Sequence, residues 1–137
     1  MFILDTNVIS ELRTGKPRQS DAVRAWAKGQ ASSTLFLSAI TMLELEIGIQ
    51  SLERRTPPQG SSLRVWVEGV RLAFAGKILP FTDCTASICA GLHVPHPRSE
   101  RDAMIAATAI EHGFAVVTRN VADFSATGVR LLNPWQV

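Results

Sequence analysis

Short apolar runs alternate along this chain with longer amphipathic segments, and this alternation limits the possible folds more than any other feature of the sequence. The runs occupy residues 1–4, 34–38, 77–81 and 114–120, and a weaker run covers residues 129–134. A continuous apolar run of this length is typical of a strand buried on both faces. Strands that alternate with helices predict an α/β fold of three layers, in which helices cover both faces of a mostly parallel sheet of four or five strands.

Helical periodicity fills the intervals between these runs. It predicts helices at residues 6–13, 20–30, 39–55, 62–76, 82–93 and 101–113. The last of them is expected to stop at Gly113, a residue type that commonly terminates helices. The stretch TPPQGSS, residues 56–62, breaks the periodicity and is interpreted as a loop. The weaker run at residues 129–134 is predicted to be an edge strand.

The length and composition of the chain agree with one globular domain over residues 1–137. Apolar residues make up 46% of the sequence and charged residues 19%, which excludes a disordered chain. No apolar run approaches the roughly 18 residues that a membrane-spanning helix needs, and the first residues lack the basic region of a signal peptide. We therefore expect a cytoplasmic protein without membrane association. Cys84 and Cys89 are expected to be reduced core thiols on different faces of one helix.

Acidic residues lie near the predicted strand ends where open α/β sheets bind their ligands. Asp5 directly follows the first strand, Glu44 lies in the second helical turn after the second strand, and Asp123 comes shortly after the fourth strand. Asp102 lies in the first turn of the helix that precedes the fourth strand. This helix runs antiparallel to the strands, so its first turn lies at the same edge as their carboxyl ends. The sequence therefore predicts that four acids from separate segments meet at one edge of the sheet.

Three of these acids also have a purely structural interpretation. Asp5 is suited to capping the helix that follows it, and Asp123 is an ordinary turn residue. Asp102 comes three residues after Ser99 and resembles the acidic partner in a capping box.

Glu44 has no such structural explanation. Ile40, Leu43, Ile47 and Gly48 recur with helical period on one side of the helix at residues 39–55, and Glu44 shares that side. This side is expected to pack inward. A carboxylate on a buried face is rare unless it is paired or binds a metal ion.

Four carboxylates at one edge repel one another strongly. At ~4 Å and an effective dielectric constant of ~20, each like-charged pair costs about 4 kcal/mol, so protons or a cation must offset the repulsion. Oxygen ligands without histidine or cysteine suit Mg²⁺ or Mn²⁺ rather than zinc, and a water beside such an ion is a nucleophile for phosphodiesters. The pattern predicts metal-assisted hydrolysis with Asp5 and Asp102 as the chief ligands, completed by Glu44 and Asp123.

Polar and basic residues surround the predicted acids. Hydroxyl and amide side chains suited to orienting carboxylates, water or phosphate are Thr6, Asn7, Thr118 and Asn120. Arginines that flank the same edge and are candidate phosphate contacts are Arg98, Arg101 and Arg119. The net charge is only +2, but if four of the 12 acids form a metal site, the 14 basic residues dominate the remaining surface. Such a surface suits a polyanionic partner.

The motifs FILDTNVISEL, SAITMLELEIGI, RDAMIAATAIEHG and VVTRNVADF occur in this order, followed by GVRLLNPW. This ordered set resembles the PIN-domain nucleases of the VapC toxin type over essentially the whole chain. The segments VISELR and NPW further resemble the branch of this family that includes the FitB-like proteins. The resemblance implies an acidic catalytic and metal-binding site made of Asp5, Glu44, Asp102 and Asp123. It also implies polar support from Thr6, Asn7, Thr118 and Asn120.

The resemblance further implies a Mg²⁺-dependent endoribonuclease that is the toxin of a type II toxin–antitoxin system. Such proteins are normally homodimers that cleave RNA until a small antitoxin inhibits them. The antitoxin typically covers the active-site groove with a segment of its chain, and the complex binds operator DNA through the antitoxin.

Two other functions stay open on the sequence. In the first, the fold acts mainly as the partner of a DNA-binding antitoxin in an operator-binding repressor complex, a reading that the FitB-like features favour. A complete set of acids favours the nuclease over this alternative. In the second, Asp5 accepts a phosphoryl group, as in receiver-like domains. Such sites carry a second acid close to the acceptor and a basic residue after a late strand. Here Asn7 and Arg119 occupy the nearest positions, which disfavours this function.

Overall fold

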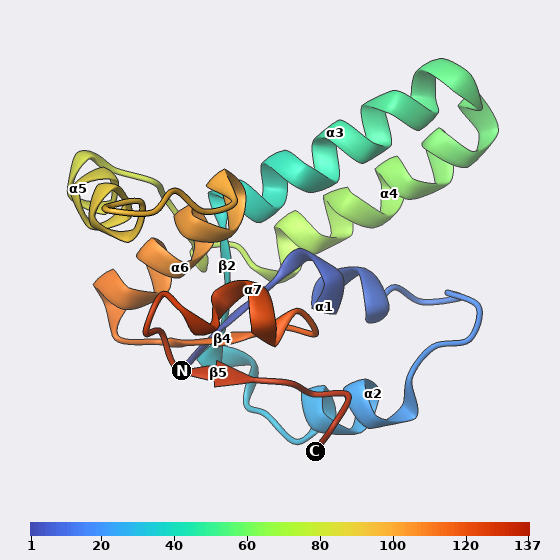
Figure 1. The fold of residues 1–137 in the computed structure, drawn as a ribbon. Coiled ribbons are helices and arrows are strands. Elements are labelled where there is room, and N and C mark those ends of the chain that lie inside the picture. The colour runs from blue at the N-terminus through green and yellow to red at the C-terminus, as the bar shows by residue number, and fades with distance from the viewer.

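The computed structural model describes residues 1–137 as five strands and seven α-helices with one short 3₁₀ helix (Figure 1). The elements are β1 (Phe2–Leu4), α1 (Thr6–Glu11), α2 (Asp21–Lys28), η1 (Ser32–Thr34), β2 (Leu35–Ser38), α3 (Ala39–Arg55), α4 (Pro57–Ala73), β3 (Ile78–Leu79), α5 (Asp83–Leu92), α6 (Glu100–His112), β4 (Ala115–Val117), α7 (Val121–Ser125) and β5 (Leu131–Leu132). The strands form one sheet in the order β3-β2-β1-β4-β5, and every neighbouring pair is parallel. The predicted parallel α/β fold and its edge strand at residues 129–134 are confirmed.

The central strand β1 shows how the sheet separates two helical layers. Successive side chains of a strand point to opposite faces, and here Leu4 and Ile3 are both fully buried in different clusters. Leu4 packs with apolar side chains of α1, α2, α3 and α4, whereas Ile3 packs mainly with those of α6 and α7. Helix α5 packs on α6 as an outer element of that second layer. The predicted three layers are therefore present.

The order of the strands reverses its direction at β1. From β1 the chain adds β2 and β3 on one side, and it then returns to add β4 and β5 on the other side. Phe2 of β1 pairs with Leu35 of β2 and with Ala115 of β4. Ligands of open α/β sheets bind at such a reversal, beyond the carboxyl ends of the strands. Asp5, the residue that follows β1, lies at this point.

The predicted loop at residues 56–62 is wrong, because most of this stretch forms the start of α4. Pro57 and Pro58 occupy the first two positions of the helix. Proline is tolerated there because the first N–H groups of a helix have no partner within the helix and the fixed φ of proline is already helical. Helix α4 then folds back along α3, and Figure 1 shows this pair extending beyond the rest of the molecule. Arg64 of α4 is paired with Glu46 and Glu53 of α3.

The prediction that the side of Ile40, Leu43 and Ile47 on α3 packs inward is confirmed only at Ile40, which is buried. Met42, Leu45 and Ile49 are the buried residues of the helix beyond its first turn, whereas Leu43 is 47% and Ile47 43% exposed. Helix α3 carries apolar residues on two sides, and packing against α4 selects the side of Leu45. Glu44 therefore lies on a side of α3 that is only partly buried.

Two smaller differences concern α7 and the cysteines. Helix α7 was not predicted, because five residues are too few to establish a helical period. Cys89 is buried and Cys84 is exposed, so the two thiols are free and lie on different faces, but only Cys89 is a core residue. Helix α5, which carries both, packs on α6 along one side and leaves the other side open. No helix in the structure combines the length and apolar character needed to cross a membrane.

Candidate active site

Asp5 lies between the end of β1 and the start of α1, and only 4% of its surface is exposed. Its backbone N–H continues the sheet by donating to the carbonyl of Val117 at 2.9 Å. One carboxylate oxygen accepts from the N–H of Thr6 at 2.8 Å, so Asp5 does cap α1. The other oxygen accepts from the hydroxyl of Thr118 at 2.8 Å and from the amide of Asn7 at 3.3 Å. A helix cap needs no such second set of donors, and their presence fixes the orientation of the whole carboxylate.

Thr118 connects this carboxylate to the turn after β4. Its side chain is fully buried, and its hydroxyl accepts from the N–H of Asn120 at 3.0 Å while it donates to Asp5. Asn7 bridges the same two segments, because its amide oxygen accepts from the N–H of Arg119 at 3.3 Å. The first turn of α1 and the turn after β4 are therefore held together around Asp5.

Glu44 reaches the same region from α3. Its side chain is 25% exposed, and one carboxylate oxygen accepts from the hydroxyl of Thr6 at 2.7 Å. The fully buried Thr41, one turn earlier in α3, places its hydroxyl 3.3 Å from that of Thr6. The other oxygen of Glu44 lies 3.8 Å from a guanidinium nitrogen of Arg101, in the first turn of α6. These contacts join α1, α3 and α6 around one carboxylate.

Asp102 and Asp123 lie in the first turns of α6 and α7. Asp102 is half-buried, and Ser99 makes no capping hydrogen bond to the helix, so the alternative of a capping box is not supported. A negative charge at this position is favoured by the helix dipole. Asp123 is exposed.

A polar hollow of about 280 Å³ collects most of the predicted site residues. No apolar residue contributes to its lining, which consists of Asp5, Thr6, Asn7, Glu44, Asp102 and Asn120. Thr118 does not line the hollow but donates a hydrogen bond to Asp5 from a fully buried position. Asp123 does not line the hollow, although it is near enough for its charge to act on Asp102.

None of the three arginines predicted to contact phosphate, Arg98, Arg101 and Arg119, lines this hollow. The guanidinium of Arg98 donates to the carbonyl of Leu92 at 2.7 Å, at the end of α5. The guanidinium of Arg119 lies over the indole ring of Trp135, 5.1 Å from its centre. Arg101 is the arginine whose guanidinium approaches a site carboxylate. A role of Arg98 or Arg119 in binding phosphate stays a prediction.

The surroundings of Asp5 and Asp102 disfavour the ionised forms of these two carboxyls. Burial raises the pKa of Asp5 from 3.8 to about 6, and the charges of Asp102 and Glu44 act in the same direction. The hydrogen bonds from Thr118 and Thr6 oppose this effect without cancelling it. The pKa of Asp102 is also raised, mainly by burial and then by the charge of Asp123. Nearby positive charge is therefore too weak to keep the pKa values of Asp5 and Asp102 at their ordinary level.

The residues of the hollow fit a hard divalent cation. Its donors are carboxylate, hydroxyl and amide oxygens, the ligand types that Mg²⁺ and Mn²⁺ prefer. No three side chains of Asp, Glu, His or Cys are drawn close enough together to form a ready-made metal site. Mg²⁺ usually keeps several waters and binds only one or two carboxylates directly, so acids spread around a hollow of this size remain compatible with it.

Thr41 is the residue of this site that the sequence analysis missed. It lies one turn before Glu44 in α3 and is fully buried. A buried hydroxyl normally has a hydrogen-bond partner, and here the partner is Thr6. The spacing of Thr41 and Glu44 was the available signal, but it became meaningful only once Thr6 was known to face both residues.

Comparison with known proteins connects this arrangement to a family. Residues 2–129 match the PIN domain family. The chain is 41% identical over 145 residues to VapC ribonuclease Y4jK of Sinorhizobium fredii, with 99% of each chain covered. It is 36% identical over 140 residues to Toxin FitB of Neisseria gonorrhoeae, covering 98% of this chain and 99% of the relative.

A solved structure titled "Structure of FitAB bound to IR36 DNA fragment" superimposes on the fold with a TM-score of 0.85 at 32% identity. The superposition covers 100% of this chain and 97% of the other. The resemblance first recognised from ordered sequence motifs is therefore confirmed along essentially the full length. The chain belongs to the PIN domain family.

Proposed function

We propose that this protein is a metal-dependent endoribonuclease that acts as the toxin of a type II toxin–antitoxin pair. The observation that carries the proposal is the buried carboxylate of Asp5, which shares one polar hollow with Glu44 and Asp102. The relatives named VapC ribonuclease and Toxin FitB support the ribonuclease and toxin assignments.

In this proposal the acids that hold the ion are Asp5, Glu44, Asp102 and Asp123, and the ion is Mg²⁺ or Mn²⁺. When bound, the ion supplies a polarised water and positive charge beside the scissile phosphodiester. Thr118 and Asn7 hold the carboxylate of Asp5 in one orientation, and Thr6 does the same for Glu44. Burial favours the protonated form of the Asp5 carboxyl, so this carboxyl would have to release its proton to act as a ligand.

The decisive test is cleavage of RNA by the purified, antitoxin-free protein with Mn²⁺ or Mg²⁺. We expect Asp5→Asn and Asp102→Asn each to lower the rate of cleavage by about 100-fold or more, because each removes a ligand of the ion. Chelation of the metal by EDTA is expected to abolish cleavage by the parent. Circular dichroism and thermal unfolding show whether the variants remain folded.

Glu100→Gln is the matched control, since Glu100 lies in the same first turn of α6 but is exposed and lines no part of the hollow. We expect this variant to retain the parental rate. Parental rates in Asp5→Asn and Asp102→Asn would refute the assignment of the site. If Asp5→Asn and Asp102→Asn fail to fold whereas Glu100→Gln folds, purely structural roles of Asp5 and Asp102 are favoured instead.

A second candidate function is that of a partner for a DNA-binding antitoxin, which carries the pair to operator DNA. The observation that favours it is the similarity to the solved structure of FitAB bound to a DNA fragment. Calorimetric titration of the isolated protein with Mn²⁺ separates the two functions. The nuclease requires saturable binding that Asp5→Asn weakens, whereas a partner without catalysis requires neither binding nor cleavage.

We further propose that the working form is a homodimer. Helix α3 exposes Leu43 and Ile47 on either side of Glu44 along the chain, at 47% and 43% exposure. Exposed apolar side chains of this size beside a site are typical of a surface that another chain covers.

A further inference from the structure

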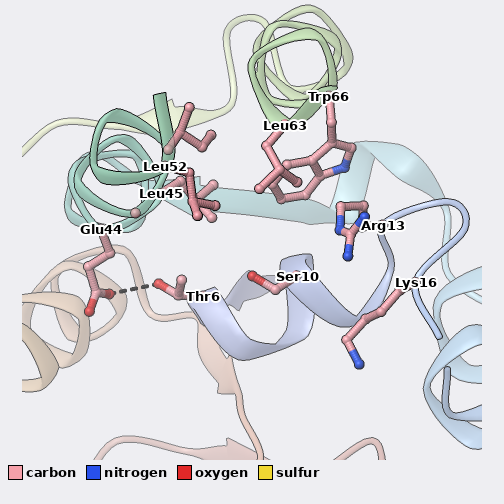
Figure 2. A pocket seen from close by; sticks show the side chains of 11 residues that line it. Thr6, Ser10, Arg13, Lys16, Glu44, Leu45, Leu52, Leu63 and Trp66 are labelled. Carbon is pink, nitrogen blue, oxygen red and sulfur yellow. Dashed lines mark hydrogen bonds between the residues drawn. The ribbon is translucent and has the colours of Figure 1, made fainter. Parts of the chain in front are cut away.

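A second hollow of about 340 Å³ lies directly beside the acidic one, between α1, α3 and α4 (Figure 2). Thr6 and Glu44 line both hollows. The hydrogen bond between these two residues, drawn in Figure 2, therefore forms part of the boundary between them. A molecule bound at the acids therefore lies next to this second hollow.

The inner part of this second hollow is apolar and contains one aromatic ring. The apolar side chains that line it are Leu45, Ile49, Leu52, Leu63 and Trp66. The indole of Trp66 is partly exposed, and its N–H makes no hydrogen bond within the protein. Ser10 contributes a hydroxyl from α1 that likewise makes no hydrogen bond within the protein, and Gly48 contributes no side chain at all. The hollow thus offers a flat apolar surface together with two free polar groups.

The end of the second hollow away from Glu44 is positively charged. Thr6, Ser10 and Arg13 follow one another along one side of the chain from α1, a distance of about 10 Å at 1.5 Å per residue. The guanidinium of Arg13 takes part in no ion pair or hydrogen bond within the protein. Lys16 adds a second cation and lies 3.0 Å from Glu11.

Glu11 fixes the segment that carries these cations. Its carboxylate is buried, pairs with Lys16 and accepts from the N–H of Ser20 at 2.6 Å. The amide of Gln19 donates to the carbonyl of Glu11 at 2.7 Å. The basic end of the hollow is therefore held in place rather than carried on an untethered loop.

We propose that this second hollow is a nucleotide subsite, which holds the base next to the scissile phosphate of a single-stranded RNA. The inference rests on the proposed ribonuclease function. The acids take the scissile phosphate through the ion, Trp66 provides a stacking surface for the base, and Arg13 contacts the following phosphate. Unpaired bases of RNA are recognised by stacking on aromatic rings and by hydrogen bonds to their edges, for which Ser10 and the indole N–H are available.

The order of charges favours RNA over a peptide as the occupant. A cation-binding site at one end, an apolar space in the middle and a free arginine at the other end reproduce the sequence phosphate, base, phosphate. A peptide would have to combine an apolar side chain with a correctly placed acidic group to use both the middle of the hollow and Arg13, whereas every nucleotide of an RNA carries both a base and a phosphate.

The test measures kcat/KM and the positions of cleavage on short single-stranded RNAs in Mn²⁺. We expect Trp66→Leu to lower kcat/KM by about 5- to 100-fold, the range for loss of one base-stacking contact, and Trp66→Phe to retain most of it. Arg13→Gln is expected to raise KM for all sequences alike and to reduce its dependence on salt. Unchanged kcat/KM and cleavage positions in Trp66→Leu would overturn the inference.

Gly48→Leu tests the subsite without removing any packed side chain. A Cβ added at Gly48 has no atom within 4 Å, so the new side chain is tolerated by the fold and occupies the hollow. We expect a loss of kcat/KM of about 10-fold or more, with a thermal stability that is unchanged or raised because leucine has a higher helix propensity than glycine. The matched control is Gly91→Leu in α5, where an added Cβ also meets no atom within 4 Å and the hollow is distant. Equal activity of both leucine variants would contradict the proposal.

Binding to RNA in the Asp5→Asn background separates failure of the subsite from failure of the nuclease. Fluorescence anisotropy with a labelled RNA of the same sequence reports binding without cleavage. If the parent does not cleave RNA but Trp66→Leu weakens binding, the subsite stands and the nuclease falls. If the variants weaken only the affinity for the antitoxin and leave RNA binding and cleavage unchanged, the hollow docks a protein and the inference is overturned.

Discussion

Asp5 serves two purposes that place opposite demands on one residue. As a cap of α1 and a partner of Thr118 it stabilises the junction between β1 and β4. As a buried carboxylate near Asp102 and Glu44 it costs free energy when ionised, which is why its pKa is raised to about 6. Sites that retain such a charge do so for function rather than for stability.

The raised pKa predicts how the stability of the metal-free protein depends on pH. Below 3.8 Asp5 is protonated in both the folded and the unfolded states, and the full stability is present. Between 3.8 and about 6 only the folded state retains the proton, so its stability falls as the pH rises. The loss contributed by Asp5 reaches up to about 3 kcal/mol above pH 6.

Asp5→Asn isolates this contribution, because its side chain cannot ionise. In EDTA we expect the free energy of unfolding of the variant, relative to the parent, to increase by about 1–3 kcal/mol between about pH 4 and about pH 7.5. Urea titrations at the two pH values measure it. Groups distant from Asp5 titrate equally in both proteins and cancel in the difference, whereas the coupling of Asp5 to Asp102 and Glu44 is part of the measured effect. A constant difference between variant and parent would show that Asp5 is not destabilised by its surroundings.

At the scale of elements, the hairpin of α3 and α4 is joined by charge and by close backbone contact. Arg64 donates to both carboxylate oxygens of Glu46, at 2.7 and 3.0 Å, and to Glu53 at 2.9 Å. Arg71 adds a contact of 2.7 Å to Glu46, and hydrogen bonds from Arg64 lower the pKa of that glutamate to about 2. These side chains are partly exposed, so each pair contributes at most modestly.

Gly60 marks a close approach of the two helices. A Cβ added there would lie 2.6 Å from both the Cα and the backbone nitrogen of Glu53, and backbone atoms cannot yield as a flexible side chain does. Gly60→Ala is therefore expected to lower the free energy of unfolding by about 1–3 kcal/mol. Chemical denaturation measures the change.

Gly69→Ala in the same helix is the control, since an added Cβ there has no neighbour within 4 Å. We expect this substitution to leave stability unchanged or to raise it by up to about 1 kcal/mol through helix propensity. Equal effects of the two alanine substitutions would mean that the helices separate easily at Gly60.

The contrast between strands and helices explains what the sequence predicted. Continuous apolar runs identified all five strands, and parallel topology alone placed Asp5, Glu44 and Asp102 at one edge. The inward side of α3 was not predictable from its own sequence, because apolar residues occupy two sides and only the partner α4 decides between them. The first residues of α4 were themselves not predicted as helix, because Pro57 and Pro58 suggest a loop unless they lie at the first positions of a helix.

At the scale of the whole molecule, the acidic hollow requires the three central strands β2, β1 and β4 to be assembled. Asp5 follows β1, Glu44 follows β2 and Asp102 precedes β4, so strands on both sides of the sheet reversal contribute. The guanidiniums of Arg98 and Arg119 show the limit of predicting such a site from position in the sequence. Each arginine lies near the edge, but local contacts with Leu92 and Trp135 turn its charge elsewhere.

The proposed homodimer follows from what the folded chain leaves uncovered. Leu43 and Ile47 lie one turn apart on α3 and remain 47% and 43% exposed, next to a carboxylate that the nuclease needs. A second copy that covers them would remove this apolar surface from water. It would also bring its own chain beside the acidic hollow.

Replacing these two residues tests that assembly directly. We expect Leu43→Ser combined with Ile47→Ser to convert the protein from dimer to monomer in sedimentation velocity, because an interface loses its apolar anchors. The control is Val65→Ser combined with Leu72→Ser on α4, where the exposed fractions are 75% and 79%. Those residues are more exposed but lie away from the acids, so this variant is expected to remain dimeric. Dissociation by the α4 pair alone would place the dimer contact on α4 and contradict a contact beside the acidic hollow.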